Sequence, residues 1–354
     1  MNQEFWRDRS VFVTGHTGFK GGWLCLWLQS CGARVHGYAL PPPTDPSLFV
    51  EAQVQAGLAS HQIGDVRDGA ALRAAMERAA PDIVFHLAAQ PLVRHSYAEP
   101  VETYAVNVMG TVNLLESARA LGSVTALVNV TTDKCYENKE WNWGYRENEP
   151  LGGHDPYSNS KACSELVTAA YRASFHHQGA PWIASGRAGN VIGGGDWALD
   201  RLVPDALRAL GSEATMKVRH LGAIRPWQHV LEPLSGYIVL AERLATQGRT
   251  YAEAWNFGPD ESDARTVGWI LEHLRQLCPG LSWEIEGEGG VHEAHFLKLD
   301  SSKARSLMGW RPRWSLAKAL EKSVDWHVAW RGGGAMRDTC VAQIAEYEAD
   351  AADE

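Results

Sequence analysis

Short apolar runs alternate with helix-like segments through the first half of the chain. Strand candidates lie at residues 10–14, 34–38, 82–87 and 126–130, and the stretch 22–28 is a typical apolar helical segment. Continuous apolar strands separated by helices are typical of a parallel sheet covered on both faces. Because parallel strands need right-handed crossovers, the pattern predicts an α/β fold with a doubly wound, Rossmann-type parallel sheet.

The pattern changes near residue 190. Glycine and tryptophan crowd residues 193–197, and aromatic and basic residues mix at 225–229. We expect residues 1–187 to form a dinucleotide-binding domain that also receives a segment near 227–257. Residues 188–226 and 258–330 are expected to form a smaller, mixed α/β substrate-binding lobe. Residues 331–354, rich in glycine and then in acidic residues, are interpreted as a flexible tail.

A glycine-rich turn follows the first predicted strand and precedes a helix. Its three glycines suit a tight turn, close approach of the main chain to a pyrophosphate, and packing of the helix on the strand. The start of the helix would offer free N–H groups to the anion. Lys20 could contact a phosphate or equally well be solvated. The predicted dinucleotide contacts in this turn are Gly15, His16, Thr17, Gly18, Phe19, Lys20 and Gly21.

Two later strand ends add candidate cofactor contacts. Asp65 and Val66 follow the third strand, where a carboxylate can accept a hydrogen bond from an adenine amino group, although Asp65 could instead cap a helix. The second strand runs into Gly37-Tyr-Ala-Leu-Pro41 without the acid that usually bonds the adenosine ribose, so these residues leave NAD and NADP open. After the fourth strand, small residues leave room for a cofactor, and the candidate contacts are Leu87, Ala88, Ala89 and Gln90.

A tyrosine and a lysine stand four residues apart in the second half of the predicted sheet domain. Asp155 can cap and Pro156 can start a helix, which would place Tyr157 and Lys161 on one face. A phenol, with an ordinary pKa of ~10, is a poor base at neutral pH. A nearby ammonium and a positive nicotinamide ring would lower that pKa and make Tyr157 a candidate base.

A third chemical element begins where the fifth predicted strand ends. Thr132 can bond a sugar hydroxyl or the Tyr157 oxygen, and Asp133 and Lys134 follow at once. The alternative is a solvated Asp–Lys pair in a turn. Because ligands of open α/β sheets bind at the carboxyl ends of the strands, we favour a role in the reaction.

The glycine turn, Thr132 and the Tyr157–Lys161 pair together resemble the extended short-chain dehydrogenase/reductase superfamily. Within it, several segments resemble the nucleotide-sugar 4,6-dehydratases that act on CDP-glucose, from about residue 6 to about residue 330. The dehydratases for dTDP-glucose and GDP-mannose have a glutamate where this chain has Lys134. The matching segments are Thr14-Gly-His-Thr-Gly-Phe-Lys-Gly21, Ala88-Ala-Gln-Pro-Leu-Val-Arg94, Thr132-Asp-Lys-Cys-Tyr-Glu-Asn138, Trp143-Gly-Tyr-Arg-Glu-Asn148, Arg187-Ala-Gly-Asn-Val-Ile-Gly-Gly-Gly-Asp-Trp197 and Arg225-Pro-Trp-Gln-His229.

The resemblance implies a tightly held NAD and an internal redox reaction. Tyr157 would take the proton of the sugar's 4-hydroxyl as hydride leaves carbon 4, water would leave across carbons 5 and 6, and hydride would return to carbon 6. The product would be CDP-4-keto-6-deoxyglucose, an intermediate towards dideoxy sugars such as those of O-antigens. We hypothesise that Lys134, or a water that it positions, is the carbon 5 base and that Asp133 is the acid. The predicted substrate contacts are Arg94, Asn190, Arg225, Glu293 and His295.

Composition excludes several other classes of protein. With 33 basic and 42 acidic residues the net charge is −9, which disfavours nucleic acid as a partner. No apolar run is long enough to span a bilayer, and the N-terminus lacks the apolar stretch of a signal peptide. Six scattered cysteines are interpreted as reduced thiols of a cytoplasmic protein. His292-Glu-Ala-His295 lacks the i, i+4 spacing of a zinc helix, so no metal is expected.

Two other functions stay open at this stage. One is a 4-epimerase or decarboxylase of the same superfamily, which would not need an acid and a base directly after Thr132. The other is a non-catalytic dinucleotide sensor, which the presence of Tyr157 and Lys161 disfavours. By analogy with the superfamily we also expect a homodimer or higher homo-oligomer, to which the helix over 157–175 could contribute.

Overall fold

The protein is built around one seven-stranded parallel sheet. The computed structural model describes residues 2–175, 181–212, 214–218, 220–285 and 297–350. The strand order β11-β6-β5-β4-β1-β2-β3 reverses direction beside β1, as in a doubly wound sheet. The fold class predicted from the sequence is therefore confirmed. The strands are β1 (Ser10–Thr14), β2 (Arg34–Ala39), β3 (Ser60–Ile63), β4 (Ile83–His86), β5 (Ala126–Val130), β6 (Trp182–Ala188) and β11 (Ala254–Phe257).

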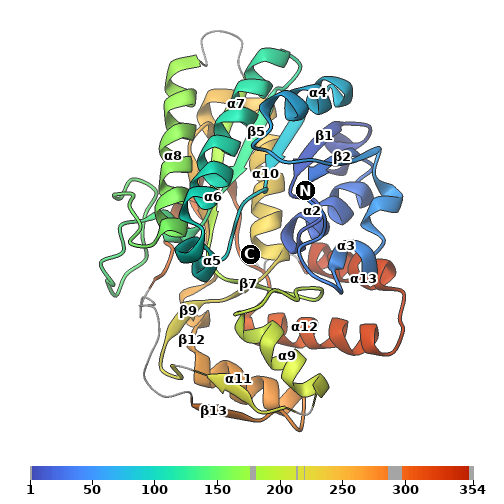
Figure 1. Cartoon of the computed structure of the whole chain (residues 1–354), viewed down its shortest axis with the longest axis vertical. Helices are drawn as coiled ribbons and strands as arrows, with labels where there is room; N and C mark the ends of the chain where they lie inside the picture. The colour runs from blue at the N-terminus through green and yellow to red at the C-terminus, as the bar shows by residue number, and fades with distance from the viewer. Residues whose placement is uncertain (1, 176–180, 213, 219, 286–296, 351–354) are drawn as a thin grey trace.

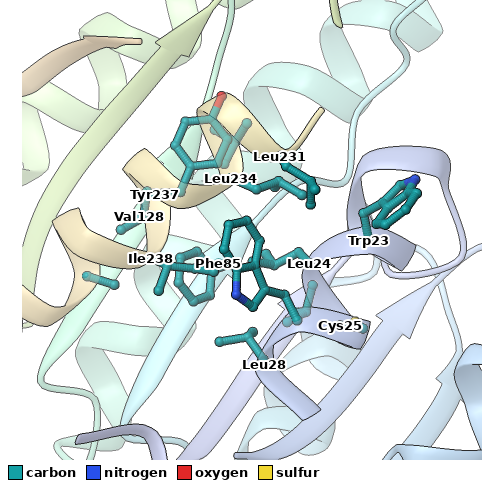
Figure 2. Packing of buried hydrophobic residues seen from close by; sticks show 14 of the residues in the cluster. Trp23, Leu24, Cys25, Leu28, Phe85, Val128, Leu231, Leu234, Tyr237 and Ile238 are labelled. Atoms are coloured by element: carbon teal, nitrogen blue, oxygen red, sulfur yellow. The ribbon is translucent and has the colours of Figure 1, made fainter. Parts of the chain in front are cut away.

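Three helices cover one face of the sheet: α2 (Phe19–Ser30), α10 (Leu231–Gln247) and α13 (Met336–Ala349). The helix α2 is apolar almost all round, which suits an element enclosed on several sides. In Figure 2, Leu24 and Leu28 of α2 lie around Phe85 of the sheet together with Leu234 and Ile238 of α10. This packing fixes the helix that starts at the glycine turn against the sheet.

The opposite face is covered by α4 (Gly69–Ala79), α7 (Gly110–Leu121) and α8 (Pro156–Phe175). Alternate strand residues divide between the faces, so that Phe12 packs towards α4 and α7 while Val13 packs towards α2. The short helices α5 (Val93–Ala98), α6 (Pro100–Tyr104) and the π-helical η2 (Ala105–Met109) lead into α7 and contact α8. In Figure 1 they form the blue-green to green layer beside α8.

A second apolar cluster lies below the sheet in Figure 1. It joins α9 (Leu202–Ser212), α11 (Val267–Leu277) and α12 (Leu316–Arg331). Leu320 of α12 belongs to this cluster. Trp326 of the same helix belongs instead to the apolar cluster that α2, α10 and α13 form against the sheet. The division of the chain at residues 187, 226, 257 and 330 stays a prediction. The small pairs are β7 (Val191–Ile192) with β10 (Gln228–His229), β8 (Met216–Val218) with β13 (Trp283–Ile285), and β9 (Ile224–Pro226) with β12 (Ala264–Thr266).

The expectation of a flexible tail is wrong for most of its length. Residues Met336–Ala349 form α13, and Cys340, Ile344 and Tyr347 are buried against the core. Trp27 of α2 makes an edge contact with Tyr347 and donates its indole N–H to Glu348 at 2.9 Å. The acidic composition hid an apolar stripe, because the exposed face of a docked helix carries its charges.

Two further short helices are α1 (Gln3–Trp6) and α3 (Leu48–Glu51). Among the residues that the structure describes, no helix combines the length and apolar character needed to cross a bilayer.

Candidate active site

The glycine turn is as tight as its spacing predicts. Gly15 has φ +77°, and a Cβ there would lie 2.7 Å from the main-chain nitrogen of Ala88. A Cβ on Gly21 would lie 2.2 Å from the carbonyl oxygen of Gly15, so helix and turn meet through bare backbone. The N-cap of α2 is Gly18, which offers no side-chain acceptor, and the first N–H groups of this 12-residue helix are available to an anion.

Polar side chains of the turn bond to residues on and after the neighbouring strands. His16 is buried, and its Nε2 lies 2.7 Å from Nδ1 of His61 on β3. Burial and the charge of His61 lower the pKa of His16 to about 4, so this imidazole is neutral at pH 7. Gly37 on β2 leaves the space that the ring fills, since a Cβ there would lie 2.4 Å from it. Thr17 donates to the carbonyl of Leu40 at 2.8 Å.

Lys20 is half-buried within the turn rather than solvated. Its Nζ lies 5.9 Å from the centre of the Tyr237 ring. Burial and the charges of Arg201 and Lys161 lower the pKa of Lys20 to about 8, while Asp133 opposes that shift. The turn therefore brings a cation into the neighbourhood of Lys161 and Asp133. The preceding residue, Phe19, is partly buried beside Gly193.

The other predicted cofactor contacts line the same edge of the sheet. The N–H groups of Leu87 and Ala88 both reach Oγ1 of Thr14, 3.2 Å away. Val66 is buried against Gly110. Gln90 donates its amide to Thr103 at 2.9 Å and so is partly committed within the protein.

Asp65 is engaged by its neighbour. Arg67 donates its main-chain N–H to one carboxylate oxygen at 2.9 Å and its guanidinium to the other. These bonds hold the pKa of Asp65 below its ordinary value. Asp65 does not cap a helix, because α4 is capped by Asp68. A contact of Asp65 with adenine stays a prediction.

The helix α8 begins as its first residues predict. Asp155 accepts from the main-chain N–H of Ser158 at 2.8 Å, and Pro156 is the first helical residue. Tyr157 and Lys161 are both buried, with 8% and 7% of their surface exposed, near the N-terminal end of α8 beside β5. The Lys161 ammonium lies 3.5 Å from the carbonyl of Val130, and burial lowers its pKa to about 8.

The tip of β5 meets this helix. Thr132 donates a hydrogen bond of 2.9 Å to the Asp133 carboxylate, and it lies close enough to the Tyr157 phenol to oppose the rise of that pKa. Asp133 is 3% exposed, and its burial raises its pKa although Lys134, Thr132 and Arg225 oppose the shift. A carboxyl whose pKa is raised is suited to act as an acid. Lys134 is half-buried beside it.

The expectation of a lowered Tyr157 pKa is not met by the protein alone. Burial raises the pKa of Tyr157 well above its ordinary value, although the Thr132 hydrogen bond and the charge of Arg201 oppose that shift. Removing a phenolate from water costs more free energy than its interactions with Thr132 and Arg201 supply.

The predicted substrate residues fall into three groups. Arg225, on β9, lies near enough to Asp133 for its charge to act on that carboxyl. Asn190 connects β6 to β7, and its carbonyl accepts from the N–H of Gln228 at 3.1 Å. Arg94 is exposed on α5 and forms an ion pair with Asp200 at 2.9 Å. Glu293 and His295 lie outside the described residues.

Two ion pairs at the site were not predicted. Glu165 and Arg187 are 1% and 3% exposed and meet at 2.9 Å. Both had a sequence signal: Glu165 lies four residues after Lys161 on the same helix face, and Arg187 is a charge inside a central strand, which needs a partner. Arg201, whose charge acts on Tyr157 and Lys20, binds the buried Asp196 at 2.8 Å. Within the described ranges no group of His, Cys, Asp and Glu side chains is arranged to hold a metal ion.

The sequence matches one family model and many curated proteins. Residues 12–254 match the model described as GDP-mannose 4,6 dehydratase. A CDP-glucose 4,6-dehydratase of Salmonella typhimurium is 54% identical over 353 residues, which cover 98% of each chain. A dTDP-glucose 4,6-dehydratase of Xanthomonas campestris is 26% identical, covering 89% of this chain and 92% of that protein.

Solved structures share the fold. A UDP-glucose-4-epimerase from Stenotrophomonas maltophila, with bound NAD and formylated UDP-arabinopyranose, superposes with a TM-score of 0.80 at 21% identity, covering 92% of this chain and 100% of that one. A UDP-glucuronic acid 4-epimerase from Bacillus cereus, in complex with UDP-glucuronic acid and NAD, gives 0.77 at 21%, covering 90% and 99%. With the glycine turn, the buried Tyr157–Lys161 pair and the match of 98% of its length, the chain belongs to the nucleotide-sugar 4,6-dehydratase family of the extended short-chain dehydrogenase/reductases.

Proposed function

We propose that this protein converts CDP-glucose into CDP-4-keto-6-deoxyglucose and water, with NAD as a regenerated cofactor. The observation that carries the proposal is that the buried Asp133, with the half-buried Lys134 beside it, lies close to the buried Tyr157 and Lys161 at the carboxyl edge of the sheet. Support for the CDP sugar comes from the Salmonella relative, which is 54% identical over nearly the whole chain. An epimerase needs no acid and base at this position, so the site favours dehydration.

The residues of the glycine turn suit a dinucleotide. The bare backbone at Gly15 and Gly21 permits the close approach that a pyrophosphate requires, and the start of α2 supplies N–H donors and the positive end of its dipole. The end of β2, at Ala39, carries no carboxylate. NAD, when bound here, would accept hydride from carbon 4 of the sugar and return it to carbon 6.

Tyr157, Lys161 and Thr132 would handle the proton of the sugar's 4-hydroxyl. Tyr157 takes this proton in its phenolate form and becomes a phenol. The Lys161 ammonium, one helical turn along α8, would favour the phenolate before the transfer. Since burial in the protein raises the pKa of Tyr157, a positively charged nicotinamide ring beside the phenol would supply the opposing shift.

Asp133 and Lys134 would carry out the loss of water. The 4-ketone acidifies the proton on carbon 5, which Lys134, or a water it positions, removes. Asp133, whose raised pKa favours its protonated form, gives a proton to the departing 6-hydroxyl. When hydride returns to carbon 6, the Lys134 ammonium gives a proton back to carbon 5. The proton that Tyr157 took from the 4-hydroxyl replaces the one that Asp133 gave to water, so every group ends the cycle as it began.

Substrate turnover tests the proposal directly. The purified protein is incubated with CDP-glucose, dTDP-glucose, UDP-glucose and GDP-mannose, and the product mass and retained cofactor are recorded. We expect loss of one water from CDP-glucose, with much slower reaction of the other three. An unchanged mass with altered stereochemistry at carbon 4 would instead assign an epimerase, and no reaction with any of them would favour a dinucleotide sensor.

The carbon 5 base is tested by exchange. Lys134→Met removes the amine and keeps a side chain of similar length. We expect the exchange of the carbon 5 proton with deuterated solvent to slow by about a hundredfold or more, while oxidation at carbon 4 continues. Near-normal exchange in this variant would show that another group is the base. Lys139→Met, on the loop after the short helix η3 (Asp133–Cys135), is the matched control.

Self-association and a cytoplasmic location are further proposals. Leu166 on α8, Val101 on α6 and Met109 on η2 are 57%, 81% and 52% exposed, and such apolar residues on neighbouring helices favour contact with a second copy. Leu166→Glu should lower the molecular weight in analytical ultracentrifugation. All six cysteines are free thiols, which fits a reducing compartment.

A further inference from the structure

Three side chains on α8 form one line. Tyr157, Lys161 and Glu165 are spaced four residues apart, so they lie on the same face of the helix. The mechanism uses the first two. The third is 1% exposed and lies one turn deeper, where a carboxylate is retained only if it is fully bonded.

Glu165, on α8, accepts hydrogen bonds from the end of β5 and from β6. The hydroxyl of Thr131, the residue before Thr132, donates to its Oε1. The hydroxyl of Ser185 on β6 donates to its Oε2 at 2.7 Å. This carboxylate therefore joins α8, which carries Tyr157 and Lys161, to the tip of β5, which carries Thr132, Asp133 and Lys134.

Arg187 keeps this carboxylate charged. Its guanidinium donates to both oxygens of Glu165, at 3.0 and 2.9 Å. It also donates to the Tyr136 hydroxyl at 2.7 Å, and Tyr136 in turn bonds Asn256 on β11 at 2.8 Å. Burial raises the pKa of Glu165, but the charge and hydrogen bonds of Arg187 outweigh it, so the pKa lies below its ordinary value.

Glu165 is also the main favourable charge for Lys161. Glu165 and, more weakly, Cys135 of η3 (Asp133–Cys135) raise the pKa of Lys161, whereas burial lowers it. Lys20 on α2 and His86 on β4 also face Lys161. Neither carries a negative charge, so neither favours the ammonium form of Lys161. Glu165 itself also faces Arg172 of α8.

We propose that Glu165 is a positioning residue, which ties the β5 tip to the face of α8 that carries Tyr157 and Lys161. This inference rests on the proposed function for its kinetic readout. Loss of the Thr131 bond should disturb the placement of Thr132 and Asp133. Loss of the carboxylate's charge should make Lys161 release its proton at lower pH, because an opposite charge would no longer favour the ammonium.

Two variants separate these roles. Thr131→Val removes the hydroxyl and leaves the ion pair, so it tests the tie alone. Glu165→Gln combined with Arg187→Gln removes both members of the ion pair, so that neither is left alone, and tests the charge. Glu253→Gln is the matched control: Glu253 lines the same cavity of about 350 Å³ as Glu165 and Arg187 and its side chain is 58% exposed.

The expected results differ between the variants. Thr131→Val should lower kcat about tenfold with KM within about twofold, and its alkaline limb should stay in place. The double variant should also move that limb down by about one pH unit, because activity falls as Lys161 loses its proton. The control should match the parent protein. A parent-like kcat in Thr131→Val, or an unmoved limb in a folded double variant, would overturn the proposal.

A readout without turnover keeps the inference distinct from the proposed function. Acetylation of Lys161 by acetic anhydride across pH, followed by peptide mass spectrometry, titrates this amine directly. If the parent protein does not turn over CDP-glucose, the proposed function fails while this titration still decides the inference. An identical Lys161 titration in parent and double variant contradicts it. If the double variant does not fold, Thr131→Val remains as the test of the tie.

Discussion

The glycine turn and the β5 tip lie at the same edge of the sheet and are built by different means. The turn is shaped by missing side chains, since Cβ atoms at Gly15 and Gly21 would overlap main-chain atoms. The tip is shaped by buried charged and polar groups, among them Asp133, Lys161 and Glu165. A substitution that violates a steric requirement is expected to abolish the function of the site. A substitution that changes an electrostatic interaction is expected to shift pKa values and rates by degrees.

This difference also separates binding from chemistry. The turn makes space and N–H donors for a pyrophosphate, which needs only shape and a local positive dipole. The tip must exchange protons, so its groups are kept at unusual pKa values by burial and are then balanced by specific partners. The comparison predicts four graded outcomes.

The largest effect is expected at Gly21. In Gly21→Ala the new Cβ would lie 2.2 Å from the Gly15 carbonyl oxygen, so the turn must open. We expect loss of retained NAD and of measurable turnover, together with roughly 1–3 kcal/mol of lost stability. Cofactor content after gel filtration is the measurement. Gly211→Ala on α9 is the control, because its Cβ would meet only Arg331, at 3.7 Å. Normal NAD content in Gly21→Ala would show that the turn is not limited by sterics.

At the β5 tip, Asp133→Asn keeps the shape and removes the acid. We expect kcat to fall by about 10²- to 10⁴-fold, as for loss of a general acid, with NAD retained. Single-turnover kinetics should show that oxidation at carbon 4 survives better than dehydration. Asp338→Asn, exposed in the first turn of α13, is the control. A loss of less than tenfold would assign the acid to another group.

Stability against pH measures the cost of buried groups beside the tip. His86 is buried with Nδ1 2.7 Å from the Thr14 hydroxyl, and burial, with the charge of Lys161, lowers its pKa to about 3. As pH falls below about 6.5, the unfolded chain takes up a proton there that the folded protein refuses, so the free energy of unfolding falls. His86 should contribute about 2 kcal/mol of this loss between pH 8 and 5.

Urea unfolding at the two pH values tests this. His86→Gln should remove its share of the pH dependence, and His95→Gln, at an exposed position, should not. Equal slopes for the parent and His86→Gln would contradict the assignment. Glu232 works in the opposite direction, because burial raises its pKa to about 7 and folding then favours its protonated form at low pH.

The smallest effect is expected at Asp65. Both of its carboxylate oxygens are already bonded to Arg67, so only part of its bonding capacity can reach an adenine amino group. Asp65→Asn should weaken NAD binding by roughly three- to tenfold, the value of one ordinary hydrogen bond. Titration calorimetry on cofactor-free protein measures it. Asp68→Asn, which keeps the cap of α4, serves as the control, and unchanged affinity in Asp65→Asn would remove Asp65 from the cofactor site.

Much of the fold follows from local pattern. The predicted strands at 10–14 and 126–130 coincide with β1 and β5, because fully buried parallel strands are continuous apolar runs bounded by turns. The start of α8 could be located from Asp155 and Pro156, since cap chemistry is local. The meeting of Tyr157 with Thr132 follows from the same reasoning, because both lie at the carboxyl edge of the sheet.

What the sequence concealed depends on distant partners. The spacing of Glu165 from Lys161 places both on one helix face, but only the fold shows that Thr131, Ser185 and Arg187 surround Glu165. The raised pKa of Tyr157 comes from burial, which spacing does not report. The acidic C-terminal region resembled a solvated end because its apolar positions, among them Ile344 and Tyr347, are few and widely spaced.

The docking of α13 on α2 has a consequence for biosynthesis. Trp27 and Glu348 are bonded across 321 positions of the chain, so the helix behind the glycine turn gains this contact only after residue 348 has been translated. We therefore expect α13 to dock on α2 after synthesis of the sheet strands, as a late step of folding.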